Sequence, residues 1–399
     1  MNAPGKKNAV QSMPLLGRRG VIYAGLALLF VAVFLSIVQG LLNAFEFSHD
    51  FQWSPARVFL LRENPYQLYL DGNIDRRIIH SQIPNYAQLL YVLILPYAAM
   101  PYAAAKVAWG LTNIALAVAS FSVSAGTFGL SRRQHLLGIA VFLMATPTRN
   151  AIGNGQQSLF VLAAFIFSIS LVVNGPSADG AGLQIDRQRR KMLSAICAGL
   201  AYVKYSFAPS LGVAYLRTFG CRYLLLSFSP IVLGIVIFGV WTGSNLASLD
   251  FLSQPVRVAA EAVPFGAGDL LSLIQAFFPG DIRVEYAAKV LCVLLAGGVP
   301  FLMKPLAKSL EWWSFVSVAS LSFVTHLGYD YVFYLLPFLW AIKHLHGLRG
   351  KAIAALVAYP WFAARALALM GVSTTVLLIL GFAVNVLILY VLRCSTARH

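Results

Sequence analysis

The sequence is short of charged residues. Only 11% of its 399 residues are charged, whereas about a quarter are charged in a typical soluble domain. Hydrophobic residues make up 59% of the chain, and the mean hydropathy is +0.74. No polar stretch is long enough to form a soluble domain of useful size, so we expect a single polytopic membrane domain over residues 1–399.

Cysteines are also scarce, and the common nucleotide and metal motifs are missing. The four cysteines form no CxxC pair, which argues against a disulfide framework and a cysteine metal site. Nothing resembles a Walker loop, a zinc signature or a dinucleotide fingerprint, so a nucleotide-linked donor has no obvious site. We find one strong carboxylate candidate and no acidic pair within one motif. We therefore expect no cofactor and favour a metal-independent reaction, with assistance by a divalent metal ion as the open alternative.

Negative charge is rarer than positive charge, which gives a net charge of +16. The basic residues gather between apolar runs, for example at 132–133 and 187–191, as the positive-inside rule describes. We therefore expect bilayer lipids around the protein and no nucleic-acid partner. Counting basic residues places both termini in the cytoplasm and most acidic residues at the outer face. We expect a multi-pass protein of a bacterial inner (plasma) membrane.

Apolar runs fill most of the chain, and about 20 apolar residues suffice for a helix to cross a bilayer. The first run is too long for a cleaved signal and is expected to be retained. The pattern predicts an all-α integral membrane protein with about 10–13 transmembrane or partial helices, and with juxtamembrane helices at the outer face. The predicted runs are 20–43, 86–98, 101–127, 135–147, 157–174, 193–216, 222–242, 284–303, 312–327, 329–342, 352–369 and 373–392.

Three polar segments separate these runs: an outer loop at 44–83, a second outer loop at 243–283 and a cytoplasmic loop at 174–191. The run 193–216 carries Lys204 and Pro209 in its middle. We expect it to enter the membrane and return as a kinked hairpin, because otherwise the basic loops that follow it would face outward.

Ionisable residues, which are scarce in this chain, are concentrated in the first outer loop, in the stretch SHDFQWSPARVFLLRENPY, residues 48–66. Asp50 follows the first run, between His49 and the later Arg57. A carboxylate at a membrane interface is partly desolvated and therefore more basic, so Asp50 is a candidate general base for a hydroxyl. The alternative, which Ser48-His49-Asp50 suits well, is a cap at the start of a juxtamembrane helix.

His326 and Asp330 lie in the stretch FVTHLGYDYVFYLLPF. They would share one helical face, but Gly328 predicts a break between them. Ionisable residues at membrane depth are costly and rarely idle, so a functional role is one interpretation. The other is a histidine at a helix end, bonded to the backbone.

The stretch ATPTRNAIGNGQQSLF predicts a non-helical link between two short spans, because it is rich in Pro, Gly and Asn. Its backbone N–H groups would lie beside Arg149, Asn154, Gln156 and Gln157. Such a link is a candidate cradle for a phosphate or for sugar hydroxyls.

Lys204 is a lone cation within an apolar run, and no acid near it in sequence is its partner. A lipid phosphate would supply the missing anion, unless the side chain snorkels to the membrane surface. Arg257 and Arg365 are weaker candidates at the outer edge.

The order and spacing of six stretches make the chain similar to the polytopic glycosyltransferases of the GT-C superfamily, in particular glycosyltransferase family 87. That family includes polyprenyl-phosphomannose-dependent α-mannosyltransferases. The six stretches are DFQWSPARVFLLRENPY, NYAQLLYVLILPYAAMPYAAAKVAWGLTNIALA, NGQQSLFVLAAF, GLAYVKYSFAPSL, GDLLSLIQAFF and THLGYDYVFYLLPF.

This resemblance implies inverting transfer of a hexose, mannose first, from a polyprenyl-phosphate sugar to a glycolipid or lipid-linked glycan at the extracytoplasmic face. Asp50 takes the position of the family's general base, and Lys204, Arg149 and His326 would stabilise the departing phosphate. The Asn-Pro-Tyr of the first stretch adds Asn64 and Tyr66 as candidate site residues.

The sequence departs from the family pattern at three places. Trp53 and Ser54 stand where a tyrosine is common, Tyr205 follows Lys204 where a proline is usual, and no Pro or Ser directly precedes His326. These departures bear on the identity of the transferred sugar more than on the class of reaction.

Three other functions share the membrane spans. A transporter or flippase of lipid-linked sugars would need no base in the first outer loop, and such proteins often carry internal repeats, which we do not find. An oligosaccharide ligase or polymerase usually depends on a large outer loop rich in Arg and His. A purely structural membrane subunit would not explain cations at membrane depth.

Overall fold

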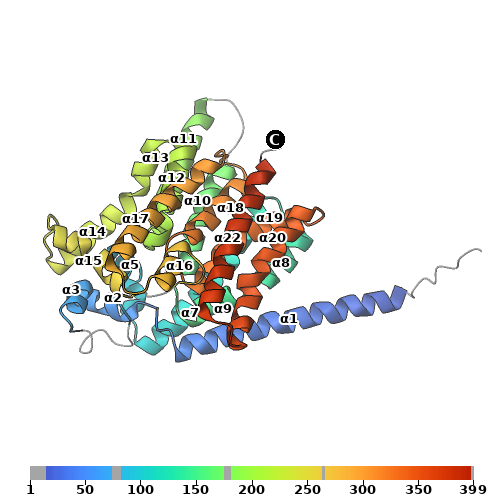
Figure 1. The fold of residues 1–399 in the computed structure, drawn as a ribbon, viewed down its shortest axis with the longest axis horizontal. Helices are drawn as coiled ribbons and strands as arrows, with labels where there is room; N and C mark the ends of the chain where they lie inside the picture. Colours follow the sequence, from blue (N-terminus) through green and yellow to red (C-terminus); the bar gives the residue numbers. More distant parts are fainter. Residues whose placement is uncertain (1–14, 74–81, 175–180, 263–265, 397–399) are drawn as a thin grey trace, which may run out of the picture.

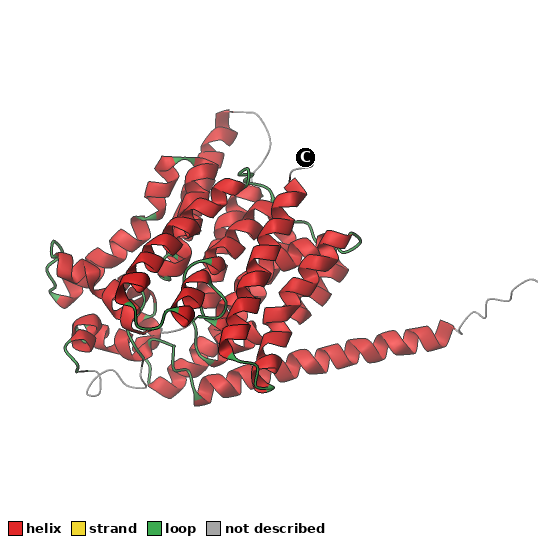
Figure 2. Ribbon diagram, viewed as in Figure 1, coloured by secondary structure: helices red, strands yellow, loops and turns green. Residues whose placement is uncertain are grey.

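The computed structural model describes residues 15–73, 82–174, 181–262 and 266–396. Within these ranges the chain is helical and contains no β-strand (Figure 2). Most helices form one bundle, while α1 (Leu15–Glu46) projects from its side (Figure 1). The predicted all-α fold is confirmed.

Within the described ranges, six helices are long and apolar enough to cross a membrane, which confirms a polytopic membrane protein. A further pair, α8 (Arg132–Met144) and α9 (Thr146–Gly153), passes the same test but is bent by 56°. The six are the Tyr23–Glu46 part of α1, α7 (Tyr102–Thr127), α13 with α14 (Cys221–Ser227 and Ser229–Thr242), α17 with η2 (Ile282–Gly298 and Val299–Leu302), α20 through η4 to α21 (Leu348–Ala358, Tyr359–Ala363 and Ala364–Leu369), and α22 (Thr374–Thr396).

Shorter apolar helices fill the centre of the bundle. Every residue of α18 (Leu310–Ser322) except Glu311 is buried, and α10 (Ser158–Val173) is nearly as enclosed. A short helix at membrane depth is tolerated where protein surrounds it. These two helices, with α19 (Leu335–Lys343) and the 3₁₀ segment η3 (Gly328–Tyr334), form the wall against which the candidate site is built.

The run that contains Lys204 folds as the predicted hairpin. Helix α11 (Ala181–Ala201) ends before Lys204, and the chain resumes through η1 (Tyr205–Phe207) into α12 (Ala208–Phe219). Ser194 and Tyr215 lie at nearly equal distances along the chain before and after this break, and their hydroxyls are 2.7 Å apart. Contact between residues equidistant from a break requires the chain to reverse direction there.

Both predicted outer loops contain short helices. The first holds α2 (Trp53–Leu60) and α3 (Pro65–Leu70), and the second holds α15 (Leu249–Ala262) and α16 (Leu270–Phe277). Helices α3 and α15 pack against each other. The predicted partial helix at 86–98 is present as α5 (Gln88–Leu93) and α6 (Leu95–Ala98). Residues 74–81 and 175–180 of the predicted loops lie outside the described residues.

One prediction about local structure is wrong. The stretch around Arg149 was expected to be a non-helical link, but it forms α9. Pro147 occupies the first turn of α9, where a missing backbone N–H breaks no helical hydrogen bond. The turn that the sequence suggested follows α9 and is centred on Gly155, whose φ is +69°.

Candidate active site

The loop after α1 is held against the turn after α9. The backbone N–H of Asp50 donates to the carbonyl of Asn154 at 3.2 Å. The side-chain amide of Gln157 is fully buried and donates to the carbonyl of Phe51 at 3.0 Å. These bonds fix the backbone on both sides of the Asp50 side chain.

Gly155 allows the two segments to approach closely. A Cβ atom at Gly155 would lie 2.9 Å from the Cβ of Phe51. The indole of Trp109 stacks on Phe51, with the ring centroids 5.5 Å apart, and donates to the carbonyl of Gly155 at 2.8 Å. Glycine is required here both for its positive φ and for space.

We expect Gly155→Ala to lower the free energy of unfolding by about 2–4 kcal/mol, because it combines a strained backbone with a steric clash, and also to lower activity by displacing Asp50. Gly129→Ala is the matched control. Gly129 has a similar φ of +67°, but nothing lies within 4 Å of its Cβ position, so it carries only the backbone strain. Equal losses of stability in thermal unfolding would contradict the close packing at Gly155.

Asp50 does not cap a helix. Gln52 occupies the N-cap position of α2 and makes no side-chain cap bond, and the hydroxyl of Ser48 donates backward to the carbonyl of Ala44 at 2.5 Å. His49 is exposed. The capping alternative is therefore wrong, and the Asp50 carboxylate is available for another purpose.

The Asp50 side chain is half-buried and accepts a hydrogen bond from the side-chain amide of Asn154 at 3.3 Å. Burial raises the pKa of Asp50 above its ordinary value, and the Gln156 amide and the Lys204 charge oppose this rise. A carboxylate with a raised pKa is a stronger base. Lys204, 154 positions later in sequence, therefore lies within electrostatic reach of Asp50.

Lys204 has a carboxylate partner that the sequence did not reveal. Its ammonium forms an ion pair with Asp330, which is fully buried, and donates to the hydroxyl of Ser158 at 3.3 Å. The same ammonium lies 5.0 Å from the centroid of the Tyr329 ring. The second oxygen of Asp330 accepts from the backbone N–H of Leu327 at 3.0 Å. Lys204 is thus neither a lone cation nor a snorkelling one.

Tyr86 connects the Asp50 and Asp330 regions. Its hydroxyl donates to the side-chain oxygen of Gln156 at 3.0 Å. Burial raises the pKa of this hydroxyl well above its usual value, and the charges of Asp50 and Asp330 raise it further. Gln156 lies in sequence between Asn154, which bonds to Asp50, and Ser158, which bonds to Asp330.

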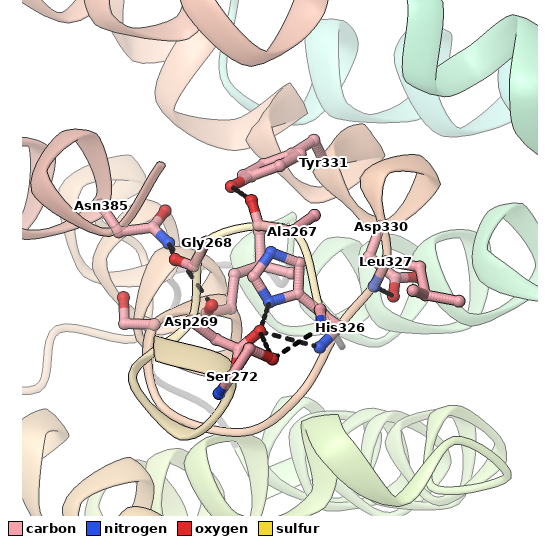
Figure 3. A network of polar contacts seen from close by, with 12 residues as sticks. Ala267, Gly268, Asp269, Ser272, His326, Leu327, Asp330, Tyr331 and Asn385 are labelled. Atoms are coloured by element: carbon pink, nitrogen blue, oxygen red, sulfur yellow. Dashed lines mark hydrogen bonds and ion pairs between the residues drawn. The ribbon is translucent and has the colours of Figure 1, made fainter. Parts of the chain in front are cut away.

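His326 lies in the predicted break, between the end of α18 and the start of η3 and outside the six candidate spans. Its Nδ1 is 3.6 Å from Oδ2 of Asp269, and both side chains are fully buried (Figure 3). The backbone N–H of His326 also points at this oxygen, at 3.4 Å.

Sequence reasoning missed Asp269. The pattern Asp-Leu-Leu-Ser is typical of a helix start, and Asp269 does cap α16 by accepting from the backbone N–H of Ser272 at 2.8 Å. Nothing in that local pattern indicates the contact with His326, which lies 57 positions away.

The loop that carries Asp269 is anchored on three sides (Figure 3). The backbone N–H of Ala267 donates to the carbonyl of His326 at 2.8 Å, and the hydroxyl of Tyr331 donates to the carbonyl of Ala267 at 2.6 Å. The amide of Asn385 on α22 donates to the carbonyl of Gly268 at 3.0 Å. The loop therefore holds Asp269 in a fixed relation to His326.

Four of the predicted site residues have polar side-chain groups that bond to other parts of the fold. Arg57 is exposed and donates to the carbonyl of Ala98 at 3.1 Å, and Arg257 forms an exposed ion pair with Asp250 at 2.5 Å.

The other two are Asn64 and Tyr66. Asn64 caps α3 and donates to the side chain of Gln254 at 2.8 Å. Tyr66 is fully buried and donates to the carbonyl of Tyr86 at 2.5 Å. The structure therefore gives Arg57, Asn64, Tyr66 and Arg257 contacts that stabilise the fold.

Two predicted arginines stand apart from the cluster. Arg149 is half-buried on α9, and its side chain makes no hydrogen bond or ion pair with the described residues. Arg365 is exposed and lines a cavity of about 270 Å³. Other residues that line this cavity include Asn150, Ala267, Gly328, Tyr331, Tyr359 and Leu378.

A helical bundle with several candidate spans, and with an aspartate, a lysine and a histidine in one polar cluster, defines an integral membrane protein with an enzyme-like site. The chain belongs to glycosyltransferase family 87, whose sequence pattern matches residues 86–327, more than half of the chain. It is therefore a membrane glycosyltransferase, which confirms the family predicted from the sequence. The match begins after Asp50 and ends before Asp330.

Neither the curated proteins nor the solved structures contain a match to this chain. In the described parts of the chain, no three His, Cys, Asp or Glu side chains are grouped so that they could hold a metal ion.

Proposed function

We propose that this glycosyltransferase moves a hexose, mannose first, from a polyprenyl-phosphate sugar to a hydroxyl of a glycolipid or lipid-linked glycan. The reaction takes place at the extracytoplasmic face, where the distribution of basic residues puts the outer loops. One observation carries the proposal: the half-buried Asp50 carboxylate, whose pKa is raised by burial, lies within electrostatic reach of the partly buried Lys204 ammonium.

Asp50 acts as the general base. It takes the proton of the acceptor hydroxyl while that oxygen bonds to the anomeric carbon of the donor. The bond from this carbon to the phosphate oxygen breaks, and its electron pair leaves with the polyprenyl phosphate. Because the oxygen attacks opposite the phosphate, the configuration at the anomeric carbon inverts.

Lys204 binds the phosphate. An ammonium has three N–H donors, and Lys204 directs two of them to Asp330 and Ser158. The third donor remains for a phosphate oxygen. His326 also contributes to phosphate binding, because the charges of Lys204 and Asp330 both act on its ring.

The proposal is tested by incubating the purified protein in liposomes with a series of polyprenyl-phosphate sugars and a lipid-extract acceptor. We expect transfer of one sugar, with inversion, and no transfer from nucleotide sugars. Movement of the lipid-linked sugar across the bilayer without transfer would show a flippase instead. Growth of long glycans on the lipid would show a polymerase.

The raised pKa of Asp50 predicts an acid limb in the pH profile of transfer. The base must be ionised, so activity is present above this pKa and is lost as the pH falls through it. Gln156→Met removes a group that lowers the pKa, and we expect the acid limb to move to higher pH. Tyr86→Phe is the control, because it removes the bond between Tyr86 and Gln156 but leaves the Gln156 side chain in place. If both variants move the limb equally, the Gln156 amide does not tune Asp50.

A further inference from the structure

We propose that Asp269 is a positioning residue that orients His326, with Nδ1 toward Asp269, so that Nε2 faces the phosphate of the lipid-linked donor and the ring becomes an imidazolium when that phosphate binds. This inference rests on the proposed function, because it takes a lipid phosphate as the ligand. It gives a role to a carboxylate of the second outer loop that the sequence did not single out.

The first argument is the geometry of the ring. Both nitrogens of His326 are buried, and neither has a hydrogen-bond partner within the described residues. An unsatisfied buried polar atom costs about 1–3 kcal/mol, so this arrangement calls for an explanation. Oδ2 of Asp269 is 3.6 Å from Nδ1, and catalytic hydrogen bonds of this kind often shorten only when the ligand binds. Nε2, at the opposite side of the ring, is left for the ligand.

The second argument is that Asp269 cannot turn away. Its Oδ1 accepts from the backbone N–H of Ser272 at 2.8 Å, and its Oδ2 accepts from the hydroxyl of Ser272 at 2.9 Å. The backbone N–H of His326 approaches Oδ2 at 3.4 Å. A carboxylate held in this way orients the imidazole, as a carboxylate next to a catalytic histidine does in general.

The third argument is electrostatic. The ionisable groups around His326 are Asp269 before α16, Asp330 and Tyr331 in η3, and Lys204 before η1. Burial lowers the pKa of His326, the two carboxylates oppose this effect, and the Lys204 charge reinforces it. The net effect is a pKa of His326 below its ordinary value. Without Asp269, burial and the Lys204 charge would be opposed by Asp330 alone, and this pKa would fall further.

This arrangement suits a phosphate that gains charge during the reaction. A polyprenyl-phosphate sugar is a diester with one negative charge, and cleavage at the anomeric carbon leaves a monoester that can carry two. The Lys204–Asp330 ion pair and the His326–Asp269 pair direct N–H donors at this group, and the Lys204–Asp330 ion pair leaves no uncompensated charge buried in the free protein. Donors that strengthen their bonds as charge develops lower the barrier of the reaction.

The test compares Asp269→Asn with Ser272→Ala. Asparagine is as good an N-cap as aspartate, so Asp269→Asn removes the charge but keeps the cap of α16. Ser272→Ala removes a hydrogen bond to the carboxylate but keeps its charge. In the pH profile of transfer, protonated His326 is lost as the pH rises, which gives an alkaline limb. We expect Asp269→Asn to move this limb to lower pH by about one unit or more, and Ser272→Ala to leave it in place.

A second measurement does not depend on activity. His326 is followed by ¹⁵N NMR of histidine-labelled protein in nanodiscs, with His326→Gln used to assign its signal among the seven histidines. We expect Nδ1 to carry a proton, the titration midpoint to fall in Asp269→Asn, and polyprenyl phosphate to raise the midpoint in the unaltered protein.

The outcomes separate this inference from the proposed function. If His326 titrates identically in the unaltered protein and in Asp269→Asn, Asp269 does not have the proposed role, even if transfer is observed. An Asp269→Asn variant that loses turnover with an unmoved alkaline limb also overturns it, because a purely structural role would give that result. If His326 pairs with Asp269 but polyprenyl phosphate does not change the titration midpoint of His326, the phosphate is not its ligand. Absence of transfer in the unaltered protein, with pairing and phosphate response intact, contradicts the proposed reaction and not the His326–Asp269 pair.

Discussion

Replacing Asp50 with asparagine is expected to lower kcat for sugar transfer by roughly 100- to 10,000-fold, the usual contribution of a general base. Asparagine has the same shape and can still accept the hydrogen bond that Asn154 donates to Asp50. It also removes a partly desolvated charge, so the thermal unfolding temperature should be unchanged or slightly higher. Transfer is measured from the polyprenyl-phosphate sugar identified as donor, and unfolding is followed in the same detergent.

Asp71→Asn is the matched control. Asp71 belongs to the same outer loop, is exposed, and accepts a hydrogen bond from the side chain of Gln67 at 2.8 Å. Its replacement is expected to change neither activity nor stability. If Asp50→Asn retains activity within a few-fold of the unaltered protein, Asp50 is not the base, and the mechanism proposed here is wrong.

The membrane spans could be predicted because the bilayer imposes them. An apolar run of about 20 residues has few other stable solutions, so the runs at 101–127 and 373–392 reappear as α7 and α22. The hairpin at Lys204 followed from the distribution of basic residues. The helix α9 was missed because Pro147 was taken as a break, whereas a proline in the first turn begins a helix.

The candidate site could be predicted only where its residues stand out along the chain. Asp50 did so because ionisable residues are rare and concentrated there. Arg57 lies in the same stretch, but it points to a backbone carbonyl of α6, and the sequence does not show which way a side chain on a short helix faces.

The two long-range side-chain pairs of the cluster could not be predicted at all. Lys204 meets Asp330 across 126 positions, and Asp269 meets His326 across 57. Contacts of such range depend on how α11, α12, α16 and η3 pack together, and a single sequence does not contain that information. The local pattern around Asp269 indicates only its capping role.

We expect the largest change in stability when the Lys204–Asp330 ion pair is broken. Lys204→Met leaves the fully buried carboxylate of Asp330 without its cation, and removal of one partner from a buried pair costs about 3–5 kcal/mol. Transfer should also be lost, because the N–H donor for the phosphate is gone. Lys289→Met is the control: Lys289 pairs with Glu285 at 2.6 Å on the partly exposed surface of α17, and such pairs contribute about 0–1 kcal/mol.

The double variant Lys204→Met/Asp330→Asn separates the two roles of Lys204. Asparagine keeps an acceptor for the backbone N–H of Leu327 and removes the unpaired charge, so most of the lost stability should return. Activity should not return, because no ammonium faces the donor phosphate. A double variant that regains both stability and transfer would show that Lys204 only balances Asp330. Thermal unfolding and initial transfer rates, measured on all three variants in the same nanodiscs, decide between these outcomes.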